Sequence, residues 1–133
     1  MFTPAEHSRH RVLVVDDNED LRQLYGAAFK MRGITADMAA NGLEAIIHLT
    51  ENGPYYCAVV LDLNMPEANG IEVARYIRAH LAWLPVAVVS GSPGMVENLR
   101  KSGLEDVAQL VMVKPVDPIT IATFVDNKCR PKR

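Results

Sequence analysis

Residues 12–17 read VLVVDD, four apolar residues that run directly into two adjacent aspartates. An unbroken apolar run of this length is typical of a β-strand buried on both faces of a sheet. Two adjacent carboxylates repel each other unless a positive charge lies nearby. The stretch therefore predicts a central strand with a charged site directly after it.

The rest of the chain alternates between short apolar runs and segments of helical periodicity. The other runs are residues 34–38, 57–61, 86–89 and 110–113. Leu21, Leu24, Tyr25 and Ala28 show the helical spacing i, i+3, i+4 and i+7. Strands buried on both faces and separated by helices predict a doubly wound α/β fold with a five-stranded parallel sheet and five helices.

Two of the helices differ in how clearly the sequence defines them. Asp117 and Pro118 form an N-cap followed by proline at the first helical position, which predicts a last helix through about residue 128. The fourth helix has only a short stripe of Met95, Val96 and Leu99. The stretch from there to residue 110 is either a frayed turn or a longer loop.

Length and composition bound the class of protein. The 133 residues predict one domain over 1–133, with a core of about 10–128 and polar tails at both ends. A net charge of -2 provides no general attraction to nucleic acid, and no apolar run is long enough to span a membrane. The polar start lacks a secretory signal, so we expect a cytoplasmic protein. Cys57 lies in an apolar run and Cys129 in a polar tail, so no disulfide is expected.

Polar residues follow four of the five predicted strands: Asp16, Asp17, Asp62, Ser90 and Lys114. The carboxyl ends of parallel strands meet at one edge, where ligands of such sheets bind. Three carboxylates at that edge need a cation between them, and Mg²⁺ prefers oxygen ligands. A carboxylate beside a metal ion and a lysine is equipped to attack phosphorus.

Each of these residues also has a simpler interpretation. Asp16 and Asp17 are equally consistent with capping the first helix, and the two roles can coexist. Asp62 alone is more typical of a turn, and a lysine before proline is usually a solvated loop charge. The joint pattern favours a common site.

The motifs together resemble the response-regulator receiver domain, the phosphoacceptor module of two-component signalling. The resemblance covers about residues 10–128 and rests on Asp16-Asp17, the DLNMP stretch 62–66, Gly70, Ser90-Gly91 and Lys114-Pro115. It implies a flavodoxin-like fold with strand order 2-1-3-4-5.

The resemblance also implies residue roles. Asp62 would be phosphorylated, while Mg²⁺ or Mn²⁺ would bind Asp17 and Asp62, the backbone carbonyl of Asn64 and, mainly through water, Asp16. Lys114 and Ser90 would contact the phosphoryl group. The remaining roles are structural for Pro66, Gly70, Gly91 and a cis Pro115, and tuning of the phosphoryl lifetime for Asn64 and Ser92.

The implied partners are proteins. A histidine kinase or histidine phosphotransfer protein would donate the phosphoryl group, and an unidentified downstream protein would receive the signal, without direct nucleic-acid binding or membrane insertion. The domain would assist its own phosphorylation and dephosphorylation rather than act as an enzyme on other substrates. The chain is expected to be a stand-alone regulator or a receiver from a longer protein.

Two departures concern the surface that would report the signal. Many receivers have an aromatic residue three positions before the lysine, where this chain has Val111. A valine cannot swing a ring between buried and exposed positions. The usual Gly-Ala pair before the last strand is also replaced by GLEDVA at residues 103–108.

Three alternative functions are weaker. A haloacid-dehalogenase-type phosphatase needs a second acid two residues after its nucleophile, where this chain has Asn64. A pseudo-receiver that binds without phosphorylation would not need the complete set of site residues. A nucleotide-binding domain would have a glycine-rich loop after the first strand.

Overall fold

A computed structural model of the protein describes residues 10–66 and 69–129. The strands are β1 (Arg11–Val15), β2 (Thr35–Ala39), β3 (Ala58–Asp62), β4 (Val86–Ser90) and β5 (Leu110–Val113). The α-helices are α2 (Glu19–Lys30), α3 (Gly42–Asn52), α4 (Asn69–His80), α5 (Pro93–Lys101) and α6 (Pro118–Cys129). Two short 3₁₀ helices, η1 (Gly53–Tyr55) and η3 (Glu105–Val107), complete the described elements.

The five strands form one parallel sheet in the order β2-β1-β3-β4-β5. This order and the alternation of strands with helices confirm the predicted fold. Strand β2 is added on one side of β1, and β3 to β5 are added on the other side. The strand order therefore reverses between β1 and β3, which are direct neighbours. In doubly wound sheets the crevice at such a reversal is where ligands bind.

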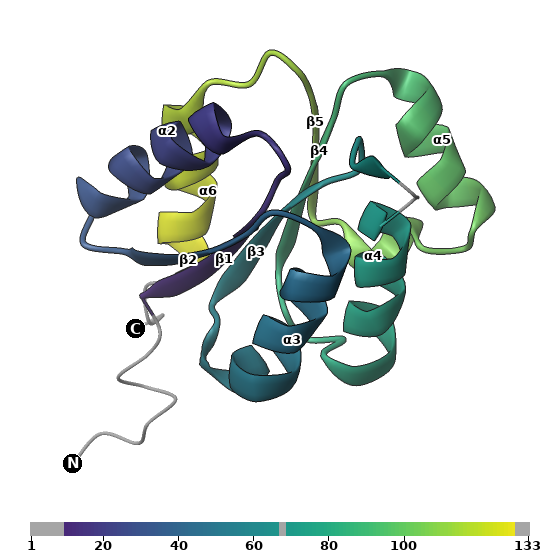
Figure 1. Ribbon diagram of the computed structural model, residues 1–133, viewed down its shortest axis with the longest axis horizontal. Coiled ribbons are helices and arrows are strands. Elements are labelled where there is room, and N and C mark those ends of the chain that lie inside the picture. Colours follow the sequence, from purple (N-terminus) through teal and green to yellow (C-terminus); the bar gives the residue numbers. More distant parts are fainter. Residues whose placement is uncertain (1–9, 67–68, 130–133) are drawn as a thin grey trace.

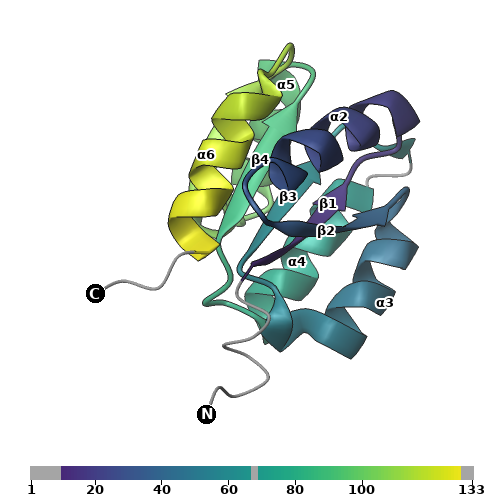
Figure 2. The ribbon, with the colours of Figure 1, turned by 90° about the vertical axis from the view of Figure 1, so that its left-hand side faces the viewer.

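Helices cover both faces of the sheet (Figures 1 and 2). Successive side chains of a strand point to opposite faces, so each central strand contributes to two cores. Leu13 and Val15 pack into the core under α3, α4 and α5, whereas Val12 and Val14 pack into the core under α2 and α6. This two-sided burial explains why the central strands are continuously apolar.

The two outer strands are less buried than the sequence predicts. Residues of β5 alternate between half-buried and exposed, and Val111 and Val113 are 43% and 46% exposed. An edge strand has a neighbour on one side only, and within the described part of the chain the helices leave these two valines partly uncovered. The apolar run 110–113 was therefore correctly identified as a strand but not as a fully buried one.

The boundaries left open by the sequence are now defined. The fourth helix is α5, and the stretch that follows it contains η3 rather than a long loop. The last helix begins at Pro118, and the Asp117 Oδ1 accepts a hydrogen bond from the Ile119 backbone N–H at 2.9 Å. Among the described residues, no helix combines the length and the apolar character needed to cross a membrane.

Cys57 and Cys129 correct the expectation that no disulfide forms. Their sulfur atoms are bonded, and their Cα atoms lie 5.0 Å apart. Helix α6 extends through Cys129, so this residue is not in a polar tail but is buried in the core shared with α2. The pairing follows from the position of α6 against β3 and not from any spacing of cysteines along the chain.

Candidate functional site

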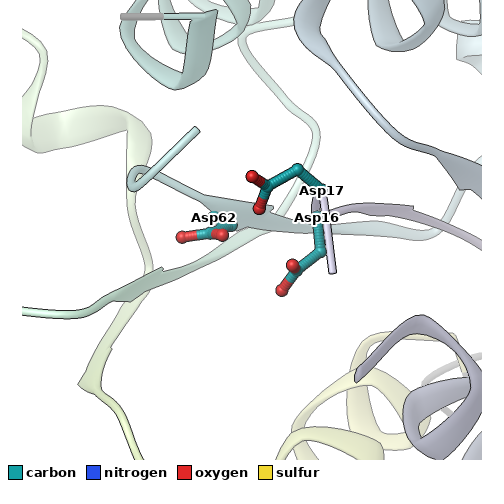
Figure 3. A group of neighbouring side chains, drawn as sticks. All are labelled: Asp16, Asp17 and Asp62. Carbon is teal, nitrogen blue, oxygen red and sulfur yellow. The ribbon is translucent and has the colours of Figure 1, made fainter. Parts of the chain in front are cut away.

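Three carboxylates gather at the carboxyl edge of the sheet. Asp16 directly follows β1 and Asp62 ends β3, and the pairing of Val15 with Leu61 places the two strand ends side by side. Asp17 joins them, and one oxygen from each of the three side chains lies within 4.8 Å of the others. Figure 3 shows the Asp17 carboxylate extending towards Asp62, with Asp16 beside them. Asp16 and Asp62 are buried, and Asp17 is exposed.

Lys114 supplies a positive charge to this cluster. It follows β5, and its backbone N–H donates to the Ser90 carbonyl at 2.7 Å. Its Nζ lies 3.2 Å from Asp62 Oδ2 and 3.7 Å from Asp16 Oδ2. Three ionised carboxylates and one ammonium have a net charge of -2. A bound divalent cation would neutralise this charge.

The pKa of Asp16 reflects this excess of negative charge. Burial raises the pKa of the Asp16 carboxyl above its ordinary value, and the charges of Asp62 and Asp17 raise it further. A hydrogen bond from the Asn18 backbone N–H, at 2.9 Å, and the charge of Lys114 lower the Asp16 pKa, but they do not outweigh burial. The donor set of carboxylate oxygens therefore fits a hard dication such as Mg²⁺.

We expect Asp16→Asn to raise the thermal stability of the metal-free protein at neutral pH, on the order of 1 kcal/mol. The folded state favours protonated Asp16, so folding stability falls as the pH rises through the folded-state pKa. The neutral amide removes that loss and can still accept from the Asn18 N–H. Mg²⁺ should raise the melting temperature of the natural chain more than that of the variant. A variant that melts lower at neutral pH, or gains equally from Mg²⁺, would contradict this account.

Asn64 connects two loops of the site. Its backbone N–H donates to Asp62 Oδ1 at 2.8 Å, which orients that carboxylate. Its side-chain Oδ1 accepts a hydrogen bond from the Gly91 backbone N–H. A Cβ at Gly91 would lie 3.0–3.2 Å from the Asn64 amide, so this glycine allows the two loops to approach closely.

The Ser90 hydroxyl lies at the end of β4 but does not point its proton at Asp62. It donates to the Ser92 carbonyl at 2.6 Å and accepts from the Ser92 N–H at 3.1 Å. Ser90 is fully buried. The sequence located this hydroxyl at the correct edge, and the structure shows that it is held by the β4–α5 turn.

Two predicted structural positions lie on the segment that follows β3, and a third follows Lys114. Gly70, in the first turn of α4, is buried against the Asp62 carbonyl and Leu63. Pro66 is exposed just before residues 67 and 68, which are outside the described residues. The peptide bond between Lys114 and Pro115 is cis.

Two supporting residues were missed by the sequence reasoning. Asn18, not Asp16 or Asp17, caps α2, because its Oδ1 accepts from the Leu21 N–H at 3.0 Å. The capping interpretation of the two aspartates is therefore wrong. Arg22 donates to the Asp16 carbonyl at 2.7 Å and fixes the loop between β1 and α2. Asparagine before an acidic first turn signals a cap, whereas nothing in the sequence indicated the contact of Arg22.

Residues 12–126 match the response regulator receiver domain family. The transcriptional regulatory protein PrrA of Mycobacterium tuberculosis is 38% identical over 105 residues, which are 79% of this chain and 43% of PrrA. The chain thus spans less than half the length of this curated relative.

Solved structures agree on the fold. A response regulator receiver domain protein from Clostridium thermocellum superposes with a TM-score of 0.78 at 23% identity, covering 90% of this chain and 93% of the other. The response regulator TrrA from Thermotoga maritima, solved in complex with Mg(2+)-BeF, gives a TM-score of 0.73 at 27% identity over 89% and 97% of the two chains.

Proposed function

The chain belongs to the response regulator receiver domain family of two-component signalling, and from that premise we propose that it takes a phosphoryl group from a partner phosphohistidine onto Asp62. The observation that carries this proposal is the contact of Lys114 Nζ with Asp62 Oδ2 at 3.2 Å, beside two further carboxylates. A nucleophilic carboxylate with a cation on one side and a metal-binding acid cluster on the other is arranged for phosphoryl transfer.

In the proposed reaction a carboxylate oxygen of Asp62 attacks phosphorus, and the bond between phosphorus and the histidine nitrogen breaks. The product is an acyl phosphate on Asp62 and a histidine that leaves on the donor. Lys114 transfers its contact from the Asp62 carboxylate to a phosphoryl oxygen. Asp17, Asp62, the backbone carbonyl of Asn64 and, through water, Asp16 would hold Mg²⁺ or Mn²⁺, which supplies positive charge against the phosphoryl oxygens when bound.

The signal would begin at Ser90. Its hydroxyl now donates to Ser92, and a phosphoryl oxygen on Asp62 would offer a stronger, charged acceptor. Turning the hydroxyl towards that acceptor releases the Ser92 carbonyl and loosens the start of α5. We propose that this movement alters protein contacts, and that the side chains of Asn64 and Ser92 control how long the acyl phosphate survives.

The phosphoryl donor, the cellular location and the recipient of the signal are proposed from the same family membership. The donor would be a histidine kinase or histidine phosphotransfer protein, and the reaction would occur in the cytoplasm. The domain would assist its own phosphorylation without turning over another substrate, so it is a signalling module and not an enzyme in the usual sense. The signal would pass to another protein or to a further part of a longer chain. The second possibility is expected because the matched region is less than half of the relative PrrA.

The direct test is intact mass after incubation with acetyl phosphate. With Mg²⁺ we expect one phosphoryl adduct, because Asp62 is the carboxylate nearer to Lys114 in an acid cluster suited to the ion. With a chelator in place of Mg²⁺ the adduct should be absent. A folded protein that binds Mg²⁺ but is never labelled would favour a pseudo-receiver, which signals by binding alone.

A further inference from the structure

The pair Cys57 and Cys129 lies at the amino ends of the strands, whereas the phosphorylation site lies at their carboxyl ends. Cys57 immediately precedes β3, and Asp62 is the last residue of the same strand. Five steps along the extended chain, from residue 57 to residue 62, separate the two positions by roughly 16 Å. The cysteine pair therefore has no part in the phosphoryl chemistry and needs its own explanation.

The two cysteines lie close enough together for a disulfide bond. Their Cα separation of 5.0 Å lies within the ordinary range for disulfides. The Cys57 backbone N–H donates to the Arg11 carbonyl at 2.9 Å, so that side of the pair is anchored to β1. Cys129 is 1% exposed within the core shared by α2 and α6.

The two cysteines differ in how far solvent can reach them. Cys57 is half-buried and lines a hollow of ≈ 240 Å³, together with Pro54, Tyr55, Tyr56, Trp83, Pro85 and Lys128. Cys129 does not line this hollow. A small reactant can therefore approach Cys57 from the hollow, while Cys129 stays covered.

The hollow has features that suit a small anionic disulfide. Trp83 is 55% exposed and offers a large apolar wall. Lys128 lies with its Nζ 5.6 Å from the centre of the Phe124 ring, which keeps its ammonium at this end of α6. A positive charge attracts a carboxylate-bearing disulfide and favours the thiolate form of a nearby cysteine.

We propose that Cys57 and Cys129 form a reversible thiol–disulfide pair that is oxidised through Cys57 by a low-molecular-weight disulfide of the glutathione type. The Cys57 thiolate attacks one sulfur of that disulfide, whose S–S bond breaks, and one thiolate leaves and takes up a proton. The Cys129 thiolate then attacks the Cys57 sulfur of the mixed disulfide and expels the second small thiol. Two protein thiols are oxidised, and one small disulfide is reduced to two thiols.

Oxidation fastens the end of α6 to the start of β3. The closed loop spans 72 positions, which include Asp62, Ser90 and Lys114. Closing so long a loop restricts the unfolded chain more than the folded one. Disulfides of cytosolic proteins are usually transient or redox-sensing, so a reversible role rests on the cytoplasmic location in the proposed function.

The test uses the full chain in buffers of defined ratios of reduced and oxidised glutathione. Free thiols are trapped by alkylation, and intact mass counts the alkyl and glutathione groups. We expect the reduced form, with two alkyl groups, to give way to a form with neither as the oxidised fraction rises, and to return on reduction. Two alkylated thiols at every ratio, or a disulfide between chains, would overturn the proposal.

The order of attack is tested by two variants. Cys129→Ala should accumulate a glutathione adduct on Cys57, whereas Cys57→Ala should form little adduct on the covered Cys129. The reverse pattern would overturn entry through the hollow. If either variant fails to fold, peptide mapping of the mixed disulfide trapped early in the natural chain decides the same point.

Thermal melting tests whether the disulfide fastens α6 to the rest of the domain. The oxidised natural chain should melt about 10 °C higher than the reduced chain. Equal melting temperatures would overturn the fastening role. Phosphorylation by acetyl phosphate, measured on the reduced chain, is independent of these readouts, so a failure of the redox pair is distinct from a failure of the receiver function.

Discussion

Asp62→Asn protein is expected to show no phosphoryl adduct under conditions that label the natural chain completely. An amide oxygen carries no full negative charge and cannot form a stable acyl phosphate. Asp16 is also buried beside Lys114, but its contact with the ammonium is longer, at 3.7 Å against 3.2 Å for Asp62. Mass spectrometry after incubation with Mg²⁺ and acetyl phosphate measures the adduct directly.

The fold of the Asp62→Asn variant should survive. The substitution weakens the contact with Lys114 but also removes one of three mutually repelling charges, so its stability should stay within about 1 kcal/mol of the natural chain. Circular dichroism and thermal melting check this. A suitable control is Asp106→Asn, because Asp106 is exposed and contacts Arg78 in the last turn of α4, at the other end of this helix from Gly70 and Asp62. Its labelling should be unchanged.

A persistent adduct on the folded Asp62→Asn variant would show that another side chain accepts phosphorus. Mapping the adduct to Asp16 or Asp17 would retain the site but change its nucleophile. Mapping it to a serine would contradict the proposed acyl phosphate, because serine gives a phosphate ester that survives alkaline hydroxylamine. Treating the same sample with alkaline hydroxylamine therefore distinguishes the two kinds of product.

The edge where the site forms could be predicted from the sequence because the sheet is parallel. Once residues 12–15, 57–61, 86–89 and 110–113 are strands, the residues that follow them must meet at one edge. The gathering of Asp16, Asp17 and Asp62 beside Lys114 also requires β1 and β3 to be neighbours, an order that the resemblance implied and that the structure shows. The roles of these residues, in contrast, were inferred from resemblance and require the experiments above.

Features that depend on side-chain packing could not be predicted in the same way. The disulfide depends on where α6 ends and how it lies on β3, and a helix extended by one residue moved Cys129 from a supposed tail into the core. The direction of the Ser90 hydroxyl depends on a local turn. The exposure of Val111 depends on how far the helices cover that face of β5, which apolar character alone does not indicate.

Gly70→Ala is expected to destabilise the protein by about 2–3 kcal/mol and to reduce labelling of Asp62. A Cβ at residue 70 would lie 2.7 Å from the Asp62 carbonyl oxygen and 2.8 Å from the Leu63 Cα. Both are backbone atoms, so neither can turn away as a flexible side chain can. Relief requires α4 to move away from the end of β3. Chemical denaturation measures the loss of stability.

Gly94→Ala is the matched control for this substitution. Gly94 is also in the first turn of a helix that follows a site strand, but a Cβ there meets only the Ser92 Oγ, at 3.8 Å. Alanine favours helix over glycine, so this variant should be more stable by about 0.5–1 kcal/mol. Equal effects of the two substitutions would contradict the role assigned to the close approach at Gly70. A large loss confined to Gly70→Ala would show that the position of the Asp62 backbone depends on a helix with no side chain at its point of contact.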